Sequence, residues 1–170
     1  MCAFQGRCFN NTHYLITFVK LLKVNTMKRA MTIFLLFGAS AAMSQGMASK
    51  AANERAIQAV LDRQVKAWNE ADIDEFMKGY LKSDSILFIG SKITSGWDAT
   101  LERYKKSYPD KAAMGQLRFE IVRMDFISAD SYLVTGKFFL TREKDAPSGI
   151  FTLLFKKKKG NWYIVYDHTS

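Results

Sequence analysis

The chain of 170 residues contains only two cysteines and two histidines, and most of these lie near its beginning. Cys2 and Cys8 are the cysteines, so residues 49–170 contain no thiol. This excludes disulfide bonds and a cysteine nucleophile from that part of the chain. His168 is its single histidine. Because no carboxylates cluster at ligand spacing either, the sequence gives no indication of a metal site. A phosphate-binding glycine loop and a nucleophile elbow are also missing, and we expect no cofactor.

Acidic residues are missing from the N-terminal part. Residues 1–50 hold six basic residues and no acid, whereas residues 51–170 hold 19 basic and 16 acidic residues, a net charge of +3. The formal charge of +9 is therefore largely a property of the N-terminal segment. We expect no nucleic-acid partner for the rest of the chain. The run Lys156 to Lys159 stands beside a Gly-Asn pair typical of hairpins, and we interpret these lysines as solvated tips rather than an anion site.

A membrane-spanning apolar run is also missing. From Met27 the chain reads MKRAMTIFLLFGASAAMSQGMAS, a basic start followed by an apolar stretch and small residues. The apolar stretch is about 13 residues long, against about 20 needed to span a bilayer. The pattern favours a cleavable signal peptide over residues 27–48 rather than a membrane anchor, and hence a periplasmic or secreted protein. Residues 1–26 are interpreted either as an over-called start, with translation beginning at Met27, or as an extended leader.

Residues 49–170 are predicted to form a single α+β domain. Apolar residues at helical spacing predict helices over residues 53–70, from Asp72 onward, and from Ser95 to a stop at Pro109. A short strand is expected in the segment SILFIG. Four longer strand-like segments with turn residues between them follow Gly115. Three helices followed by an antiparallel meander indicate the α+β class.

The predicted sheet is apolar on both faces. In the segment SGIFTLLFK, alternation places Phe151, Leu153 and Phe155 on one face and Ile150 and Leu154 on the other. A sheet with one solvated face alternates cleanly between apolar and polar residues, and this one does not. Helices can cover one face. We expect a homodimer formed through the sheet to cover the other.

Several segments carry a resemblance to a known family. They are AWNEADIDEFMKGY, SGWDATLERYKKSYP, MGQLRFE, VTGKFFLTR, SGIFTLLF and the final NWYIVYDHTS. Over about residues 53–170 the chain resembles the nuclear transport factor 2-like superfamily, in its SnoaL-like branch. The resemblance implies a cone in which a strongly curved antiparallel sheet wraps around three N-terminal helices and encloses a pocket. Relatives include isomerases, dehydratases, polyketide cyclases and epoxide hydrolases beside non-catalytic members, so the fold does not settle the function.

His168 is the first candidate for acid–base catalysis, because an imidazole titrates near neutrality. Strand alternation places Ile164, Tyr166 and His168 on one face and Asp167 on the other. Asp167 and His168 therefore cannot enter one cavity unless a bulge intervenes. The alternative is a structural role for His168 at the rim of the pocket or at the dimer contact.

Glu120 is the second catalytic candidate, because a carboxyl group facing an apolar cavity has a raised pKa. Its alternatives are burial with a partner such as Arg118, Arg123 or Lys137, or a position at a solvated edge. Asp98 is interpreted as a partner of the helix dipole and Asp84 as a turn residue.

Aromatic side chains are the expected cavity walls, with ordinary core packing as the alternative for each. They are Trp68, Tyr80, Trp97, Tyr104 and Tyr166. The sequence thus predicts an exported domain that binds a small apolar or carbonyl-containing molecule without a cofactor. An acid–base enzyme of the isomerase, dehydratase or cyclase type and a homo-oligomeric assembly module are the alternatives.

Overall fold

The computed structural model describes residues 49–170, and residues 50–170 form one compact unit. The predicted leader and signal peptide lie outside the described residues. Within residues 49–170, no helix combines the length and apolar character that a bilayer crossing requires.

Four helices are described. The first occupies residues 49–69 and buries one stripe that includes Ile57, Leu61, Gln64 and Trp68. It is followed by α2 (Ile73–Met77), whose N-cap carboxylate accepts a hydrogen bond from a backbone N–H as its sequence predicts. The third predicted helix is α3 (Trp97–Ser107), and a further short helix, α4 (Lys111–Met114), was not predicted.

The sheet has six strands in the order β2-β1-β6-β5-β4-β3. The strands are β1 (Leu87–Ile89), β2 (Ile93–Ser95), β3 (Gln116–Ser128), β4 (Ser131–Thr141), β5 (Ser148–Lys158) and β6 (Asn161–Thr169). The four long strands form the antiparallel meander that the sequence predicts. Two features were not predicted: β2 itself, and the parallel pairing that joins β1 to β6.

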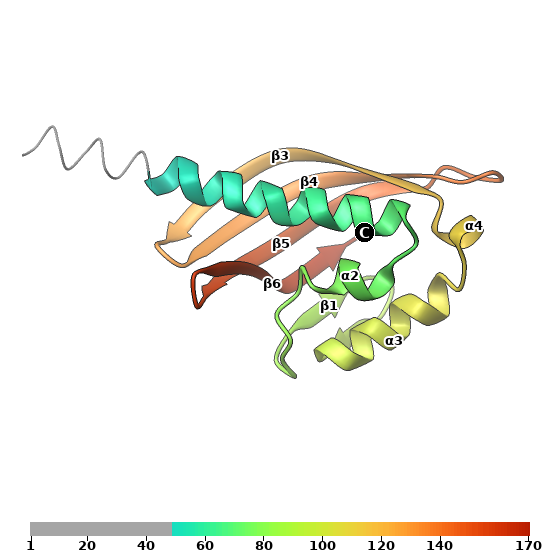
Figure 1. The fold of residues 1–170 in the computed structure, drawn as a ribbon, viewed down its shortest axis with the longest axis horizontal. Helices are drawn as coiled ribbons and strands as arrows, with labels where there is room; N and C mark the ends of the chain where they lie inside the picture. The colour runs from blue at the N-terminus through green and yellow to red at the C-terminus, as the bar shows by residue number, and fades with distance from the viewer. Residues whose placement is uncertain (1–48) are drawn as a thin grey trace, which may run out of the picture. The chain divides into compact units, whose positions relative to one another are not determined.

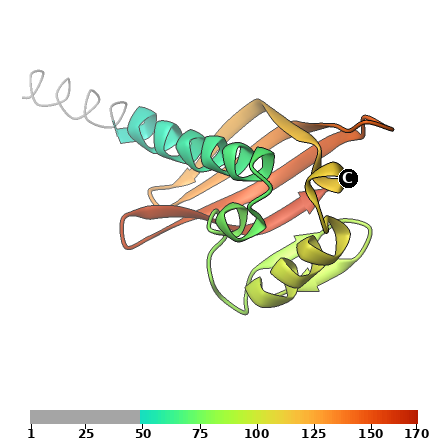
Figure 2. The same cartoon turned by 45° about the vertical axis from the view of Figure 1, so that its right-hand side comes forward.

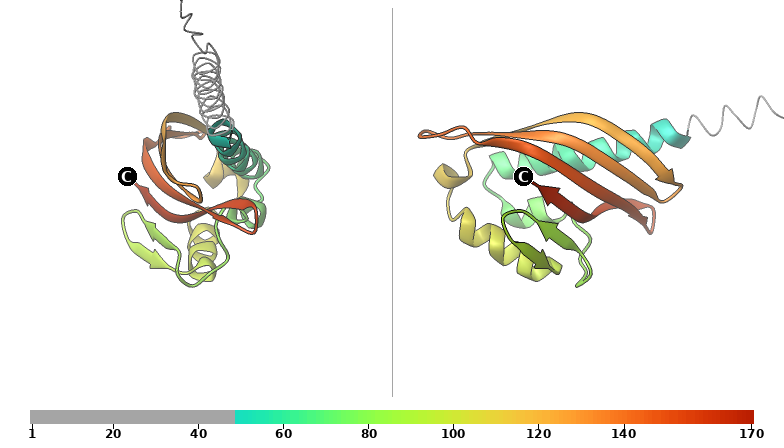
Figure 3. Two further views of the ribbon diagram at one scale, coloured as in Figure 1. Left: turned by 90° about the vertical axis from the view of Figure 1, so that its left-hand side faces the viewer. Right: turned by 180° about the vertical axis from the view of Figure 1, so that it is seen from behind.

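The sheet curls, and helices cover its concave face. The helix at residues 49–69 runs across β3, β4 and β5, while α2 and α3 lie toward β1 and β6 (Figure 1, Figure 2). An end-on view shows the long strands bending around the space that these helices close (Figure 3). Register shifts interrupt the β3–β4 and β5–β6 pairs, and such bulges increase strand twist. The fold is a cone-like α+β roll, as predicted.

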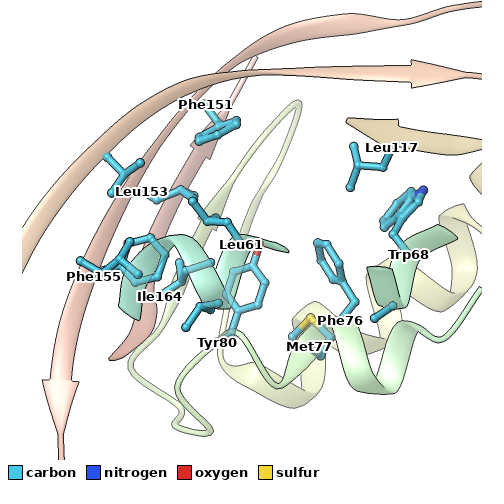
Figure 4. Close-up of a cluster of buried hydrophobic side chains, with 14 of the residues drawn as sticks. Leu61, Trp68, Phe76, Met77, Tyr80, Leu117, Phe151, Leu153, Phe155 and Ile164 are labelled. Carbon is cyan, nitrogen blue, oxygen red and sulfur yellow. The ribbon is translucent and has the colours of Figure 1, made fainter. Parts of the chain in front are cut away.

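The core lies between the helices and the concave face. Figure 4 shows Trp68 and Phe76 from the helices and Phe151 and Leu153 from β5 gathered around one interior. Phe151 lies over Gly136 of β4, where an added Cβ would come within 2.4 Å of its ring. Glycine at this position therefore gives Phe151 its place in the wall.

The β5–β6 turn is displaced by one residue from its prediction. Lys159 and Gly160 form the two-residue loop, and both have positive φ, 49° and 85°. This combination matches a type I′ hairpin turn. The Lys157 ammonium group, close to the turn, donates a hydrogen bond to Asn53 on the first helix at 3.1 Å. At least this lysine ties the hairpin to the first helix rather than extending into solvent.

Candidate functional site

A cavity of about 160 Å³ lies between the concave face of the sheet and the helices. Its apolar wall includes Trp68, Phe76, Phe119, Phe138, Phe151 and Leu153. Apolar cavities of roughly 150 Å³ hold a molecule the size of benzene. The volume therefore suits a small molecule of about ten non-hydrogen atoms or fewer.

Three of the five predicted wall residues lie at this cavity, namely Trp68, Tyr80 and Tyr104. Trp97 does not, because its indole N–H donates to the backbone carbonyl of Met77 at 3.0 Å and the ring borders a different groove. Tyr166 does not line the cavity either.

The aromatic wall is held in fixed geometry. The Trp68 ring packs edge-on against Phe76 and Tyr108, with centroids 5.2 and 4.7 Å apart. Its indole N–H donates to the backbone carbonyl of Met114 at 3.0 Å. Tyr104 packs against Phe76 with centroids 5.3 Å apart. These contacts leave the rings little freedom to close the cavity.

A buried carboxyl group faces this wall. Asp167 is 3% exposed, and within residues 49–170 it is the one carboxylic residue among the buried polar side chains. The hydroxyl of Tyr80 donates to its Oδ2 at 2.5 Å, and the hydroxyl of Thr169 donates to its Oδ1 at 2.6 Å. The Tyr104 hydroxyl lies 3.4 Å from that of Tyr80. A polar cluster thus forms at one end of an otherwise apolar cavity.

A bulge in β6 turns Asp167 inward. Leu154 pairs with Tyr166, whereas the next residue of β5, Phe155, pairs with Ile164, so Val165 is an extra residue. The alternation predicted from the sequence is therefore wrong beyond Ile164.

The bulge also determines that His168 does not face the cavity. Asp167 is buried beside the cavity, while Tyr166 is half-buried and His168 is exposed. The structure does not bring the first catalytic candidate to the cavity.

Glu120 lies away from the cavity as well. Its side chain is 51% exposed, with carboxylate oxygens 3.8 Å from the cationic groups of both Arg118 and Lys137. The carboxylate is therefore exposed to solvent near two of its expected cationic partners, and it is not buried. Asp98, in the first turn of α3, and Asp84 are also exposed.

Burial shifts the ionisation of the polar cluster. It raises the pKa of the Asp167 carboxyl above its ordinary value, an effect opposed in part by the hydrogen bonds from Thr169 and Tyr80 and by the charge of Arg103. Burial, reinforced by the nearby Asp167 carboxylate, also raises the pKa of Tyr80 and of Tyr104. The two phenols therefore stay protonated, and Asp167 retains its proton to higher pH than an exposed aspartate.

Sequence reasoning missed several polar residues of the wall: Gln64, Arg103, Ser107, Asp167 and Thr169. Arg103 and Ser107 share a helix face with Tyr104 and Tyr108, but the predicted stripe counted apolar residues alone. Within residues 49–170, no three His, Cys, Asp or Glu side chains are grouped so that they could hold a metal ion.

Comparison with solved structures gives a similarity high enough to indicate a close relationship. A nuclear transport factor 2-like protein of unknown function from Shewanella oneidensis is 40% identical over 69% of this chain and 98% of that chain, with a TM-score of 0.68. No curated protein matches the chain significantly.

Two more distant similarities concern the fold alone. A domain of unknown function with a cystatin-like fold from Nostoc punctiforme is 17% identical, covering 70% of this chain and 76% of its own, with a TM-score of 0.59. A ketosteroid isomerase-like protein from Erwinia carotovora is 22% identical, covering 68% and 93%, with a TM-score of 0.53. The sequence model of the SnoaL-like domain family matches residues 57–170 of the chain. The chain therefore belongs to the SnoaL-like family, within the nuclear transport factor 2-like superfamily.

Proposed function

We propose that this protein binds a small, largely apolar molecule in the cavity between the helices and the sheet. The observation that carries the proposal is the meeting of rigid aromatic walls with one buried carboxyl group and two tyrosine hydroxyls. Ligand sites are typically apolar clefts in which a few polar groups fix the orientation of the ligand.

The polar cluster suits a ligand that carries a carbonyl or hydroxyl oxygen. The Tyr80 hydroxyl donates a hydrogen bond to Asp167, which leaves the Tyr104 hydroxyl as the more available donor. A carbonyl oxygen at the cluster would accept a hydrogen bond from Tyr104. An apolar body would then lie against Trp68 and Phe151.

Binding is tested with phenylacetone, a neutral ketone of suitable size, by calorimetry or by amide chemical shifts of the purified protein. We expect saturable binding at a single site. Leu153→Phe places extra volume in the cavity wall and should abolish binding, whereas Leu154→Phe, on the opposite face of the same strand, should leave it unchanged. Equal binding by both variants would contradict the proposal.

A second candidate function is acid–base catalysis, and the observation that favours it is the raised pKa of Asp167. A general base works best when its pKa approaches the working pH. As an isomerase-type step, the Asp167 carboxylate would remove a proton from the carbon beside a bound carbonyl and return it at another carbon. A hydrogen bond from Tyr104 would stabilise the enolate oxygen in between.

Catalysis is tested by following deuterium incorporation from D2O into the methylene group of phenylacetone by NMR. Wild-type protein should accelerate the exchange beyond buffer. Asp167→Asn should remove the acceleration and still bind the ketone. Binding without accelerated exchange would leave binding as the function and exclude this step.

We further propose that a second copy of the chain covers the convex face of the sheet. The row Leu133–Leu154–Tyr166 is half-buried on that face, and Ile150 is 54% exposed. Apolar patches of this kind favour a partner.

We also propose that the protein is exported, with cleavage after residue 48 or nearby. N-terminal sequencing of the protein from the producing cell tests export, because an intact N-terminus would contradict it.

A further inference from the structure

We infer that the ligand of this cavity carries a carboxylate, and that the guanidinium group of Arg103 binds it at the cavity wall. The inference rests on the proposed function, because it names the class of molecule that occupies the proposed site. It predicts a small aryl- or alkyl-substituted carboxylic acid rather than a neutral hydrocarbon or alcohol.

Arg103 is held in place from two directions. It lies in α3 and is half-buried, and its Nη1 donates to the backbone carbonyl of Lys92 at 2.8 Å and to the Thr94 hydroxyl at 3.0 Å. The guanidinium carbon stands 4.5 Å from the centre of the Phe88 ring. Both protons on Nη1 are thus engaged, and the planar group is oriented before any ligand arrives.

The other edge of the same guanidinium has no acceptor among residues 49–170. Its Nε and Nη2 make no hydrogen bond there, and no carboxylate of these residues lies within 4.0 Å of Arg103. This edge carries two parallel N–H groups, the geometry that a carboxylate accepts in a bidentate pair. Arg103 is also one of the residues that line the cavity, so a ligand there can contact its side chain.

Arg142 shows what such an edge binds in this protein. Its Nη1 donates to the backbone carbonyl of Ala113 at 3.2 Å, much as Arg103 donates to Lys92. Its Nε and Nη2 donate to the two carboxylate oxygens of Asp145, at 2.6 and 2.8 Å. In both arginines Nη1 donates to a backbone carbonyl, and for Arg103 the carboxylate would come from a ligand.

Gly90 leaves room for the free edge. A Cβ added at Gly90 would come within 2.9 Å of Arg103 Nη2 and within 3.2 Å of the Phe88 ring. A larger residue at this position would displace Nη2 or the Phe88 ring on which the guanidinium group stacks. The close approach gives a second variant that disturbs the edge without removing the charge.

The charges of the cavity suit an anionic ligand. The positive charge of Arg103 acts on both Asp167 and Tyr104, lowering the pKa of each against the larger effect of burial. A ligand carboxylate at Arg103 would meet an Asp167 that burial already inclines toward its neutral form. Repulsion between two carboxylates is thereby reduced, and acid binding should be accompanied by proton uptake.

Three probes of one shape test the inference: phenylacetate, phenylacetamide and phenylacetone, titrated calorimetrically into the purified protein. We expect phenylacetate to bind tighter than phenylacetamide by on the order of 10- to 100-fold, the difference that a charge-assisted pair confers. Arg103→Met should bring the two dissociation constants together while the affinity for phenylacetone stays within about 3-fold. Arg103→Lys, which keeps the charge and loses the paired donors, should retain only part of the preference.

Arg118→Met is the matched control, because Arg118 also stacks on an aromatic ring, at 4.0 Å from the Phe139 centroid, but lies outside this cavity. It should leave the preference intact. Gly90→Ala should reduce it, which provides a reading if Arg103→Met fails to fold by circular dichroism.

Two failures are distinguishable. Equal affinity of the wild-type protein for phenylacetate and phenylacetamide, or a preference that survives Arg103→Met, would overturn the inference and leave the proposed binding function standing. Failure of all three probes to bind would contradict the proposed function and the inference together.

Discussion

The two faces of the sheet have similar apolar content and opposite surroundings. On β5, Phe151, Leu153 and Phe155 point to the concave side and are 3%, 4% and 0% exposed. Their neighbours Ile150 and Leu154 point to the convex side and are exposed and half-buried. Within the described residues, the helices cover only the concave side (Figure 3). The comparison teaches that the sequence sets which residues share a face, while the packing of helices decides which face becomes the core.

The polar groups differ between the faces as well. On the convex side, Glu120 lies 3.8 Å from both Arg118 and Lys137, in an exposed arrangement that water solvates. On the concave side, Asp167 is buried with Tyr80 and Thr169 as its donors. Enclosure by apolar walls raises the pKa of the Asp167 carboxyl.

The largest expected effect separates the faces through adjacent leucines. Leu153→Ala removes buried apolar volume and should lower the free energy of unfolding by about 2–5 kcal/mol. Leu154→Ala, on the convex face, should lower it by less than about 1 kcal/mol. Urea denaturation at a protein concentration low enough to suppress self-association measures both. Equal losses would mean that the convex face is also part of a core.

The sequence predicted the faces of β5 correctly because β5 continues without interruption through the alternating residues 150–154. It failed on β6, where Val165 is inserted between two residues that pair normally. A bulge depends on how one strand fits its neighbour, and that information lies in the pairing rather than in the local pattern. This single inserted residue explains why Asp167, and not Tyr166 or His168, lies at the cavity.

The candidate site was predictable in its aromatic part and not in its polar part. Trp68 and Tyr104 each belong to an apolar stripe at helical spacing on its own helix, which indicates that each faces the core. Arg103 adjoins Tyr104 on α3. A charged residue in a helix is usually solvated, so the sequence pattern gives no reason to place Arg103 at the cavity. Arg103 is half-buried because its guanidinium group contacts the Phe88 ring and the backbone carbonyl of Lys92. These groups come close to α3 only when β1 and β2 pair.

The proposed dimer provides the next largest effect. Leu154→Lys places a charge in the middle of the convex row and should weaken self-association at least 30-fold, about 2 kcal/mol, because an unpaired charge is costly to bury. Sedimentation velocity should show the wild-type protein at twice the mass of one chain and the variant at the mass of one chain. Lys144→Glu, in an exposed position between β4 and β5, serves as the control. A wild-type monomer would rule the dimer out.

A smaller effect tests the concave carboxyl through pH. Because burial raises the folded-state pKa of Asp167 above its ordinary value of 3.8, the folded protein retains this proton at pH values where the unfolded chain has released it. Stability should therefore fall as pH rises from about 4 to the folded pKa, by up to about 1.4 kcal/mol per unit of raised pKa. Asp167→Asn lacks this ionisation, so its stability relative to wild type should increase over that window.

Tyr80→Phe sharpens the same measurement. The Tyr80 hydroxyl stabilises the Asp167 carboxylate and lowers its pKa, so its removal should extend the unfavourable window to higher pH. Thermal unfolding across a pH series, taken as the difference from wild type, measures both variants. An identical pH dependence of stability in the wild-type protein and in Asp167→Asn would show that the pKa of Asp167 is not raised.

The smallest expected effects belong to the two residues that the sequence favoured as catalysts. His168→Ala and Glu120→Gln change exposed side chains, and each should alter the free energy of unfolding by less than about 0.5 kcal/mol. Deuterium exchange into phenylacetone and binding of phenylacetate should also stay at wild-type levels, because neither side chain lines the cavity. A large loss of exchange in His168→Ala would return the imidazole to the mechanism, and it would require β6 to slip by one residue in solution, since only that shift exchanges the inward position of Asp167 for His168.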